Sequence, residues 1–203
     1  MKRLPFVEPD EIVASLKCTV EVLSAGGVVV VPTESFYGLA VDPLSAEAVE
    51  RVHALKGRPS SLGLPVLCAD WQQLEDLVII PERFRPKLSR LWPAALTVIL
   101  PARKSIPAAK AETLAIRIPG HSGLRALLYR SGPVTGTSAN SHKMPPCVSV
   151  DDAVRSLASE PDLALDAGRS AGGEPSTIVD LTAEMPRIVR PGRVVWDDPD
   201  PEC

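Results

Sequence analysis

Lys56 and Arg58 flank a glycine at a predicted helix end, in the stretch Lys56-Gly57-Arg58-Pro59. Cations at a helix C-terminus complement the negative end of the helix dipole, which by itself is enough to explain either charge. The helix dipole does not explain why Arg58 lies beyond the glycine, where Pro59 restricts the backbone of Arg58. An arginine fork beside the point charge of a lysine can also clamp a polyphosphate. The stretch is therefore a candidate anion-binding site as well as an ordinary helix end.

A further cation, Arg117, lies within the apolar stretch 114–119. Strand alternation would place its side chain on the face opposite the large aliphatic side chains. A half-buried arginine in a strand needs an anionic partner. That partner could be a structural acid such as Asp166 or Asp180, or it could be a ligand, and the sequence alone favours neither.

Hydroxyl and amide side chains gather where apolar stretches end. Ser35 follows the valine run 28–31, while Ser138 and Asn140 close a later strand-like stretch. Such side chains can bond ribose, phosphate or a carbonyl group without adding charge. In turns they more often bond the local backbone. Two later segments add a hydroxyl and a cation, Ser176 and Arg190.

No side chain is recognisable as a nucleophile with its base. Ser138 has no histidine immediately beside it in the sequence, and Cys68 lies in an apolar run. Neither a G-x-S-x-G nor a G-x-x-x-x-G-K stretch occurs. Cations combined with hydroxyls favour chemistry that depends on positioning a substrate and neutralising charge at a phosphoryl centre.

The composition excludes several classes of protein. The 203 residues carry a formal net charge of −3, which disfavours a protein whose main task is to bind a nucleic-acid backbone. The cysteines and histidines are dispersed, without the spacing of a metal site. The N-terminus lacks an apolar signal core, and no apolar run is long enough to span a membrane. We therefore expect a cytoplasmic protein without a protein-bound metal.

Interleaved helical and strand patterns position these segments. Helices are expected over 9–27, 45–57, 81–92, 122–132 and 149–158, with a short one from Asp70. Ser45 should be an N-cap and Gly57 should follow the end of its helix. Strands are expected over 28–32, 64–68, 96–102, 114–119, 133–139, 163–168, 176–182 and 186–192. This order predicts an α/β fold around one mixed sheet, followed by a frayed acidic tail over 196–203.

The chain resembles the YrdC-like family of threonylcarbamoyl-AMP synthases in several stretches that occur in the family's order. They are VVVPTESFYGLAVDP, KGRPSSLGLPVL, WPAALTVIL, LAIRIPGH, VTGTSAN and GGEPSTIVDLT…PRIVRPG. The resemblance runs from Ile12 to Val194. It implies a single YrdC-like domain over residues 1–195, with a twisted open mixed β-sheet flanked by helices and a large positively lined cavity.

The resemblance also implies an enzyme, a nucleotidyltransferase that joins L-threonine, bicarbonate and ATP into threonylcarbamoyl-adenylate and releases pyrophosphate. This is the first step of tRNA threonylcarbamoyladenosine modification. ATP would be a substrate, accompanied by Mg²⁺. A partner transferase complex would then place the threonylcarbamoyl group on the adenosine next to the anticodon of certain tRNAs. Direct or weak tRNA binding by this chain itself is left open.

Family positions carry over to this sequence one by one. The Lys-x-Arg and Ser-x-Asn tetrad matches Lys56, Arg58, Ser138 and Asn140. The threonine-contacting positions match Ser35, Arg117 and Ser176. Nucleotide contacts would fall on Lys56, Arg58, Thr113, Ser138, Asn140, Ser149 and Arg190.

These matches imply distinct roles. Lys56 and Arg58 would neutralise the triphosphate and the departing pyrophosphate. Arg117 would meet the threonine carboxylate. Ser138 and Asn140 would hold the α-phosphate or the carbamate. Attack of an N-carboxy-threonine oxygen on the α-phosphorus would then need no protein nucleophile.

Some positions depart from the family's pattern. Leu62 stands where a lysine or asparagine is usual, which removes one contact on the phosphate side. The pair His142-Lys143 replaces a small Ser-Gly pair, and Lys143 could restore the lost charge. Ala94 stands where glycine is usual. An inactive paralogue with a weakened ATP site, an RNA-binding YrdC-like protein, and a carbamoyltransfer domain of a larger maturation enzyme are therefore the alternatives.

Overall fold

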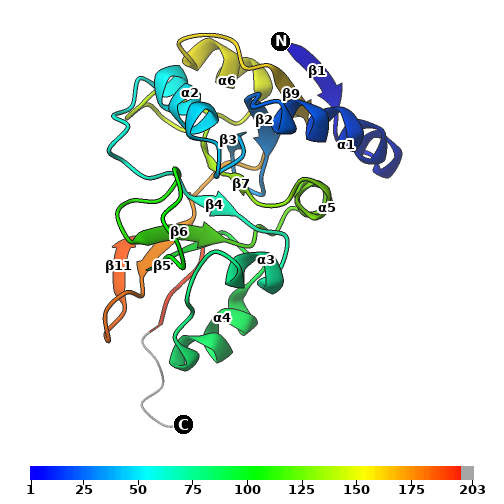
Figure 1. Ribbon diagram of the computed structural model, residues 1–203. Coiled ribbons are helices and arrows are strands. Elements are labelled where there is room, and N and C mark those ends of the chain that lie inside the picture. Colours follow the sequence, from blue (N-terminus) through cyan, green and yellow to red (C-terminus); the bar gives the residue numbers. More distant parts are fainter. Residues whose placement is uncertain (198–203) are drawn as a thin grey trace.

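The computed structural model describes residues 1–197, whose strands form two mixed β-sheets with helices packed around them (Figure 1). The first sheet has five strands in the order β1-β9-β2-β3-β8. They are β1 (Lys2–Pro5), β9 (Leu163–Asp166), β2 (Val29–Pro32), β3 (Tyr37–Ala40) and β8 (Thr137–Ser138). β9 pairs parallel with β1 and β2, and β3 returns antiparallel to β2 after the loop 33–36.

The second sheet has six strands in the order β11-β10-β5-β6-β4-β7. They are β11 (Arg187–Arg190), β10 (Thr177–Asp180), β5 (Leu96–Pro101), β6 (Thr113–Arg117), β4 (Val66–Leu67) and β7 (Val134–Thr135). β10 pairs parallel with β5 and β4 pairs parallel with β6, whereas β5 and β6 are antiparallel.

Helices cover both faces of the first sheet (Figure 1). α1 (Pro9–Ser24) and α5 (Ser122–Ser131) share an apolar cluster with Val29 and Val31, whereas α2 (Ala46–Lys56) and α6 (Val150–Ser156) share another with Val30. Because strand side chains alternate between faces, the valine run of β2 is buried on both sides. Three short elements lie beside the second sheet, α3 (Trp71–Glu75), the 3-10 turn η1 (Glu82–Phe84) and α4 (Arg85–Leu91).

One connection between the two sheets consists of a single glycine. Gly136 lies between β7 of the second sheet and β8 of the first. A Cβ atom at this position would come within 2.4 Å of Leu67 Cγ, so a larger residue would require the packing to shift. The junction therefore holds Thr137 and Ser138 at the boundary between the sheets.

Several local predictions are confirmed. The α/β class with mixed sheets and flanking helices is correct, although the strands form two sheets rather than one. The hydroxyl of Ser45 accepts from the Ala48 N–H at 3.2 Å as the N-cap of α2. Gly57 ends that helix in the left-handed conformation, at φ 58°. None of the helices within residues 1–197 is long and apolar enough to cross a membrane.

Other predictions were wrong in detail. The strands β1 and β3 were not predicted, because β3 (YGLA) carries a glycine and two small or medium side chains without a clear alternation. The predicted strand 133–139 is divided at Gly136. Trp196, assigned to a frayed tail, is 7% exposed, and the Lys87 ammonium lies 4.4 Å from the centre of its ring. The remainder of the predicted tail, 198–203, lies outside the described residues.

Candidate functional site

A cavity of about 380 Å³ lies between the sheets, within the size range of small-molecule sites. The loop 33–36 and the Gly136 junction form part of its wall, together with side chains of β5, β6, β10 and β11. Many of the residues selected from the sequence meet here, although they come from distant segments. They are Ser35, Arg58, Arg117, Ser138, Ser176 and Arg190.

Three arginines and no carboxylate line this cavity within the described part of the chain. Arg58 donates from Nη2 to the carbonyl of Gly63 at 2.8 Å, and burial lowers its pKa. Arg190 donates from Nη2 to the carbonyl of Ser176 at 2.7 Å, and burial together with the charge of Arg117 lowers its pKa. Like charges that disfavour one another's ionisation create a positive potential, which a bound anion would relieve. The cavity is therefore suited to an anionic ligand.

The anionic partner of Arg117 is Glu34. The structural pair that the sequence left open as one alternative therefore exists, but with Glu34 and not with Asp166 or Asp180. The Arg117 Nη2 contacts Glu34 Oε1, and the Gly120 N–H donates to the same oxygen at 3.0 Å. Burial opposes ionisation of Glu34, but the Arg117 charge and the Gly120 hydrogen bond outweigh it and hold the pKa of the carboxyl below its usual value. The pair connects the loop 33–36 to the end of β6.

Ser35 presents an unpartnered hydroxyl at the cavity wall. Its side chain belongs to a residue that is 3% exposed, and its Oγ has no hydrogen-bond partner among the described residues. The loop is held by Thr33, whose Oγ1 donates to the Phe36 carbonyl at 2.7 Å and accepts from the Ser35 N–H at 3.3 Å. Because a buried hydroxyl without a partner is costly, this oxygen is a candidate contact for a bound ligand.

Lys56 lies beside the cavity but is not one of its lining residues in this structure. The side chain is buried, and its Nζ donates to the carbonyl oxygens of Ser138 and Asn140, the latter at 2.6 Å. Its own backbone carbonyl accepts from the His142 N–H at 2.7 Å. Burial and the nearby charge of Arg58 lower its pKa to about 8. Lys56 thus holds the loop that carries Ser138, and in this structure it does not line the cavity in which the resemblance implies that it neutralises the triphosphate.

Other predicted residues have local partners outside the cavity. The Asn140 amide donates to two backbone carbonyls of its own loop, at 2.7 and 2.6 Å. The hydroxyl of Thr113 donates to the Lys110 carbonyl at 3.0 Å. Ser149 is the N-cap of α6 and accepts from the Asp152 N–H at 3.1 Å. Thr113 and Ser149 are therefore not brought to the cavity.

The pairing of Glu34 with Arg117 and the place of Thr97 in the cavity wall were not predicted from the sequence. Glu34 could not be paired with Arg117 from the sequence, because their contact joins two distant segments of the chain, the loop 33–36 and the end of β6. Thr97 and Ile99 both line the cavity from β5. Residues two positions apart on a strand lie on the same face, so the sequence could have predicted that they share a surface. Lys143 is exposed and is not a lining residue, so in this structure it does not restore the charge that Leu62 removes.

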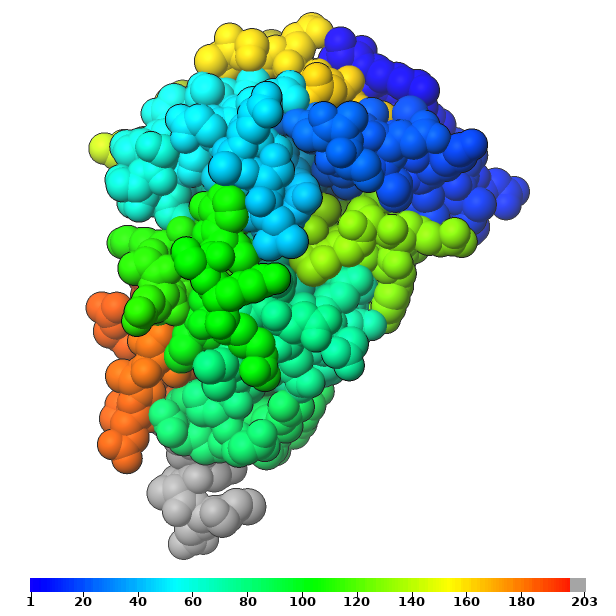
Figure 2. Space-filling model, viewed as in Figure 1, coloured from blue at the N-terminus to red at the C-terminus, as the bar shows by residue number. Residues whose placement is uncertain are grey.

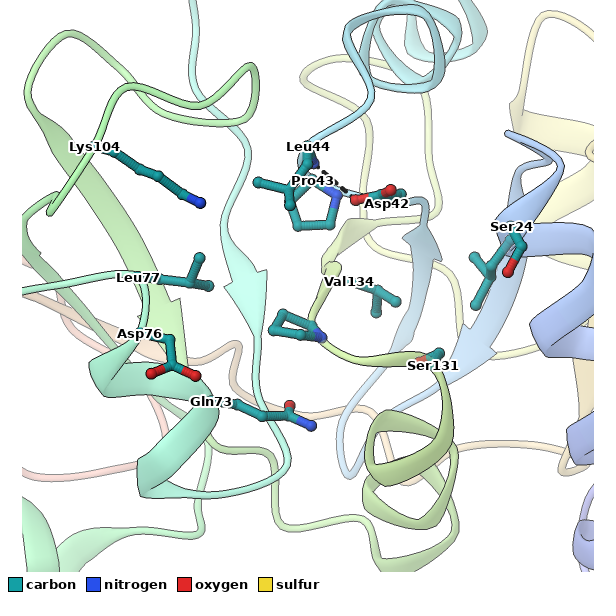
Figure 3. A pocket seen from close by; sticks show the side chains of 12 residues that line it. Ser24, Asp42, Pro43, Leu44, Gln73, Asp76, Leu77, Lys104, Ser131 and Val134 are labelled. Atoms are coloured by element: carbon teal, nitrogen blue, oxygen red, sulfur yellow. Dashed lines mark hydrogen bonds between the residues drawn. The ribbon is translucent and has the colours of Figure 1, made fainter.

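A second cavity of about 350 Å³ opens elsewhere, between the ends of α1, α3 and α5 (Figure 3). Figure 3 shows the carboxylates of Asp42 and Asp76 and the ammonium of Lys104 around it. None of the residues selected from the sequence lines it. Its mixed charge contrasts with the cationic lining of the first cavity, which we therefore treat as the candidate site.

Metal ligands do not gather in the described residues. Residues 1–197 contain no group of three or more His, Cys, Asp or Glu side chains placed to hold a metal ion. The candidate site offers guanidinium groups and hydroxyls, which bind anions directly.

Comparison with known proteins identifies close relatives over most of the chain. The family model Sua5/YciO/YrdC, described as telomere recombination, matches residues 21–192. A protein of Photobacterium profundum named threonylcarbamoyl-AMP synthase is 32% identical over 88% of this chain and 99% of its own length. One of the same name from Bacillus subtilis is 35% identical over 82% of this chain and 50% of its own length.

Solved structures share the fold. Pyrococcus abyssi Sua5 complexed with L-threonine superposes with a TM-score of 0.88 and 30% identity, covering 95% of this chain. The chain spans 58% of that protein's length. Escherichia coli YciO superposes with a TM-score of 0.81 and 27% identity, covering 94% of both chains.

Proposed function

The chain belongs to the Sua5/YciO/YrdC family, and from this premise we propose that it is a threonylcarbamoyl-AMP synthase. The reaction joins L-threonine, bicarbonate and ATP into threonylcarbamoyl-adenylate, with release of pyrophosphate. As a transfer of AMP to a carboxyl-type oxygen, this is nucleotidyltransferase chemistry. The names of the relatives favour this activity over an RNA-binding or inactive protein.

One structural observation carries the proposal. Arg58, Arg117 and Arg190 line one cavity that also exposes serine and threonine hydroxyls, and no carboxylate of the described residues lines it. ATP and threonine both bring negative charge to such a site, and the arginine fork matches phosphate and carboxylate geometry. A cavity for a neutral or cationic substrate would not concentrate cations in this way.

The chemistry requires positioning more than covalent participation. The threonine amine and bicarbonate first give N-carboxy-threonine and water. A carbamate oxygen then forms a bond to the α-phosphorus of ATP, while the bond from that phosphorus to the oxygen shared with the β-phosphate breaks and pyrophosphate leaves. No proton needs to be removed from the attacking carbamate oxygen, so no protein base is required at this step.

Each wall of the cavity would serve one part of this reaction. Arg58, beside the Gly136 junction, would neutralise charge on the triphosphate and on the departing pyrophosphate. Arg117 would bind the threonine carboxylate, with the free hydroxyl of Ser35 as a further contact. Ser138 would face the α-phosphate or the carbamate. The ammonium of Lys56, which donates to the Ser138 carbonyl, would hold this residue in place.

Mg²⁺ would accompany ATP. In the absence of a carboxylate cluster in residues 1–197, the phosphate oxygens and water would be its main ligands, as Mg²⁺ often retains several waters. The ion would supply charge neutralisation on the phosphates, which Arg58 complements from the protein side.

The product is a reactive mixed anhydride, so a transferase must consume it soon after release. We place that step in the cytoplasm, where a threonylcarbamoyl transferase complex would pass the group to tRNA. Direct tRNA binding by this chain is not needed for the proposed reaction.

Omission of single substrates tests the proposal. Pyrophosphate release from ATP should require both threonine and bicarbonate, and it should proceed without tRNA. Arg58→Ala should abolish the release, whereas Lys104→Ala, which removes a cation from the second cavity, should leave it unchanged. Release that persists without threonine, or in the Arg58→Ala variant, would contradict the proposal.

A further inference from the structure

The guanidinium group of Arg117 is attached to the protein along one edge. Its Nε donates to the carbonyl of Ala94 at 3.0 Å, and its Nη2 contacts Glu34 Oε1. An arginine has five N–H donors in a rigid fork. The donors on Nη1 are not used by these two contacts, so one edge of the fork remains available.

Glu34 contacts Arg117 without lining the cavity itself. Arg117 is a lining residue of the cavity, whereas Glu34 is not. The Arg117 side chain is 9% exposed and the Glu34 side chain 19%. Glu34 therefore does not occupy the position that a ligand carboxylate would take. It contacts the guanidinium at Nη2 and leaves the donors of Nη1 free for a ligand.

Glu34 is itself fixed by contacts to other parts of the chain. Its Oε1 accepts from the Gly120 N–H at 3.0 Å, and its backbone carbonyl accepts from Arg193 Nη1 at 3.1 Å. A Cβ atom on Gly120 would lie 3.3 Å from Glu34 Oε1, so the carboxylate sits closely against the backbone there. The ion pair thus fixes an arginine of the second sheet to a loop of the first.

We propose that Glu34 is a positioning residue that orients Arg117 for the carboxylate of the amino-acid substrate. The inference rests on the proposed function, because it takes the ligand of Arg117 to be threonine. A carboxylate binds an arginine most strongly when the two planar groups lie in one plane and form two parallel hydrogen bonds. Glu34 and the Ala94 carbonyl fix that plane before the substrate arrives, which reduces the ordering cost of binding.

The sign of the effect separates this role from simple electrostatics. If Glu34 acted only through its charge, Glu34→Gln would remove a repulsion and strengthen the binding of a carboxylate. If Glu34 positions Arg117, the same substitution weakens binding, since the amide cannot form the ion pair that holds the fork. We expect the second result.

Calorimetric titration with L-threonine tests the proposal. Glu34→Gln should weaken threonine binding about tenfold, while Glu174→Gln, which removes an exposed carboxylate from the loop before Ser176, should bind like the wild type. Gly120→Ala, which crowds the Glu34 carboxylate without changing any charge, should also weaken threonine binding. Melting temperatures of all variants establish that each is folded.

A double-mutant cycle isolates the action through Arg117. In an Arg117→Gln background, Glu34→Gln should cause no further loss, because its effect depends on the guanidinium. L-Threoninol, which lacks the carboxylate, should bind Glu34→Gln and wild-type protein equally. If Glu34→Gln bound threonine as tightly as the wild type, or if the losses in the cycle were additive, the positioning role of Glu34 would be overturned and the proposed function would stand. A wild-type protein that binds no threonine would instead overturn the proposed function together with this inference.

Discussion

The ammonium group of Lys56 donates a hydrogen bond to the backbone carbonyl of Asn140 at 2.6 Å, from a residue that is only 4% exposed. It contacts the carbonyl of Ser138 as well. The side chain at the end of α2 therefore fixes a loop more than eighty residues further along the chain. Its charge is directed at backbone dipoles, and the cationic lining of the cavity comes from arginines.

Replacement of Lys56 by methionine should release this loop. The substitution keeps the apolar stem but removes the donor of the buried Asn140 carbonyl and leaves the Ser138 carbonyl only the Asn140 N–H, at a cost of about 1–3 kcal/mol in the free energy of unfolding. Hydrogen exchange should accelerate at the amides of residues 139–144, and pyrophosphate release should fall. Arg58→Ala should also lose activity but keep wild-type exchange in this loop. Unchanged exchange in Lys56→Met would contradict the role given to Lys56.

The buried Lys56 also predicts a pH dependence of stability. Its pKa is lowered to about 8 in the folded protein, from an ordinary value of 10.5, mainly by burial. Between these values the unfolded chain binds more protons than the folded one, so this group makes stability rise with pH, at most by about 1.4 kcal/mol per pH unit. Lys56→Met lacks this group, so subtracting its unfolding free energy from that of the wild type isolates the contribution of Lys56. This difference should grow in favour of the wild type from pH 8 to 10. A difference that is constant or shrinks over this range would refute the assignment.

The Gly136 junction should not tolerate a side chain. Gly136→Ala places a methyl group where Leu67 Cγ lies 2.4 Å away, and we expect a loss of about 1–3 kcal/mol in the free energy of unfolding. Chemical denaturation measures it. The further substitution Leu67→Ala should reduce the penalty of Gly136→Ala relative to its penalty in the wild type, because it removes the clashing atoms. Equal penalties in both backgrounds would show that the strain lies elsewhere.

Ser35→Ala should separate binding from stability. The substitution removes a buried hydroxyl that has no partner among the described residues, so the free energy of unfolding should change by no more than about 0.5 kcal/mol or rise slightly. The KM for threonine should increase several-fold, because the hydroxyl is proposed to bond the substrate. A stability loss with unchanged KM would mean that Ser35 is a structural residue.

The sequence was informative wherever a short segment determines its own structure. Ser45 and Gly57 marked the ends of α2 correctly, since capping depends on residues within a few positions. The valine run was correctly predicted to form a strand. Contacts between the sheets were not accessible in the same way. The partner of Arg117 proved to be Glu34, and Lys56 proved to face two carbonyls, because both contacts depend on how distant segments are brought together.

The resemblance to a family supplied what local patterns could not. Ser35, Arg58, Arg117, Ser138, Ser176 and Arg190 do meet at one cavity. Thr113 and Ser149 do not line this cavity, and the structure gives each a local backbone partner. Both residues lie outside the sequence stretches that carry the resemblance, so their assignment had less support than that of the residues within those stretches.

The most direct test of the account follows the carbon of bicarbonate. The protein is incubated with labelled bicarbonate, threonine and ATP, and the adenylate product is isolated. We expect the label in a product that contains AMP and threonine, formed with one pyrophosphate per labelled molecule and only when all three substrates are present. An adenylate of threonine without the label, or pyrophosphate release that does not need bicarbonate, would contradict the proposed reaction.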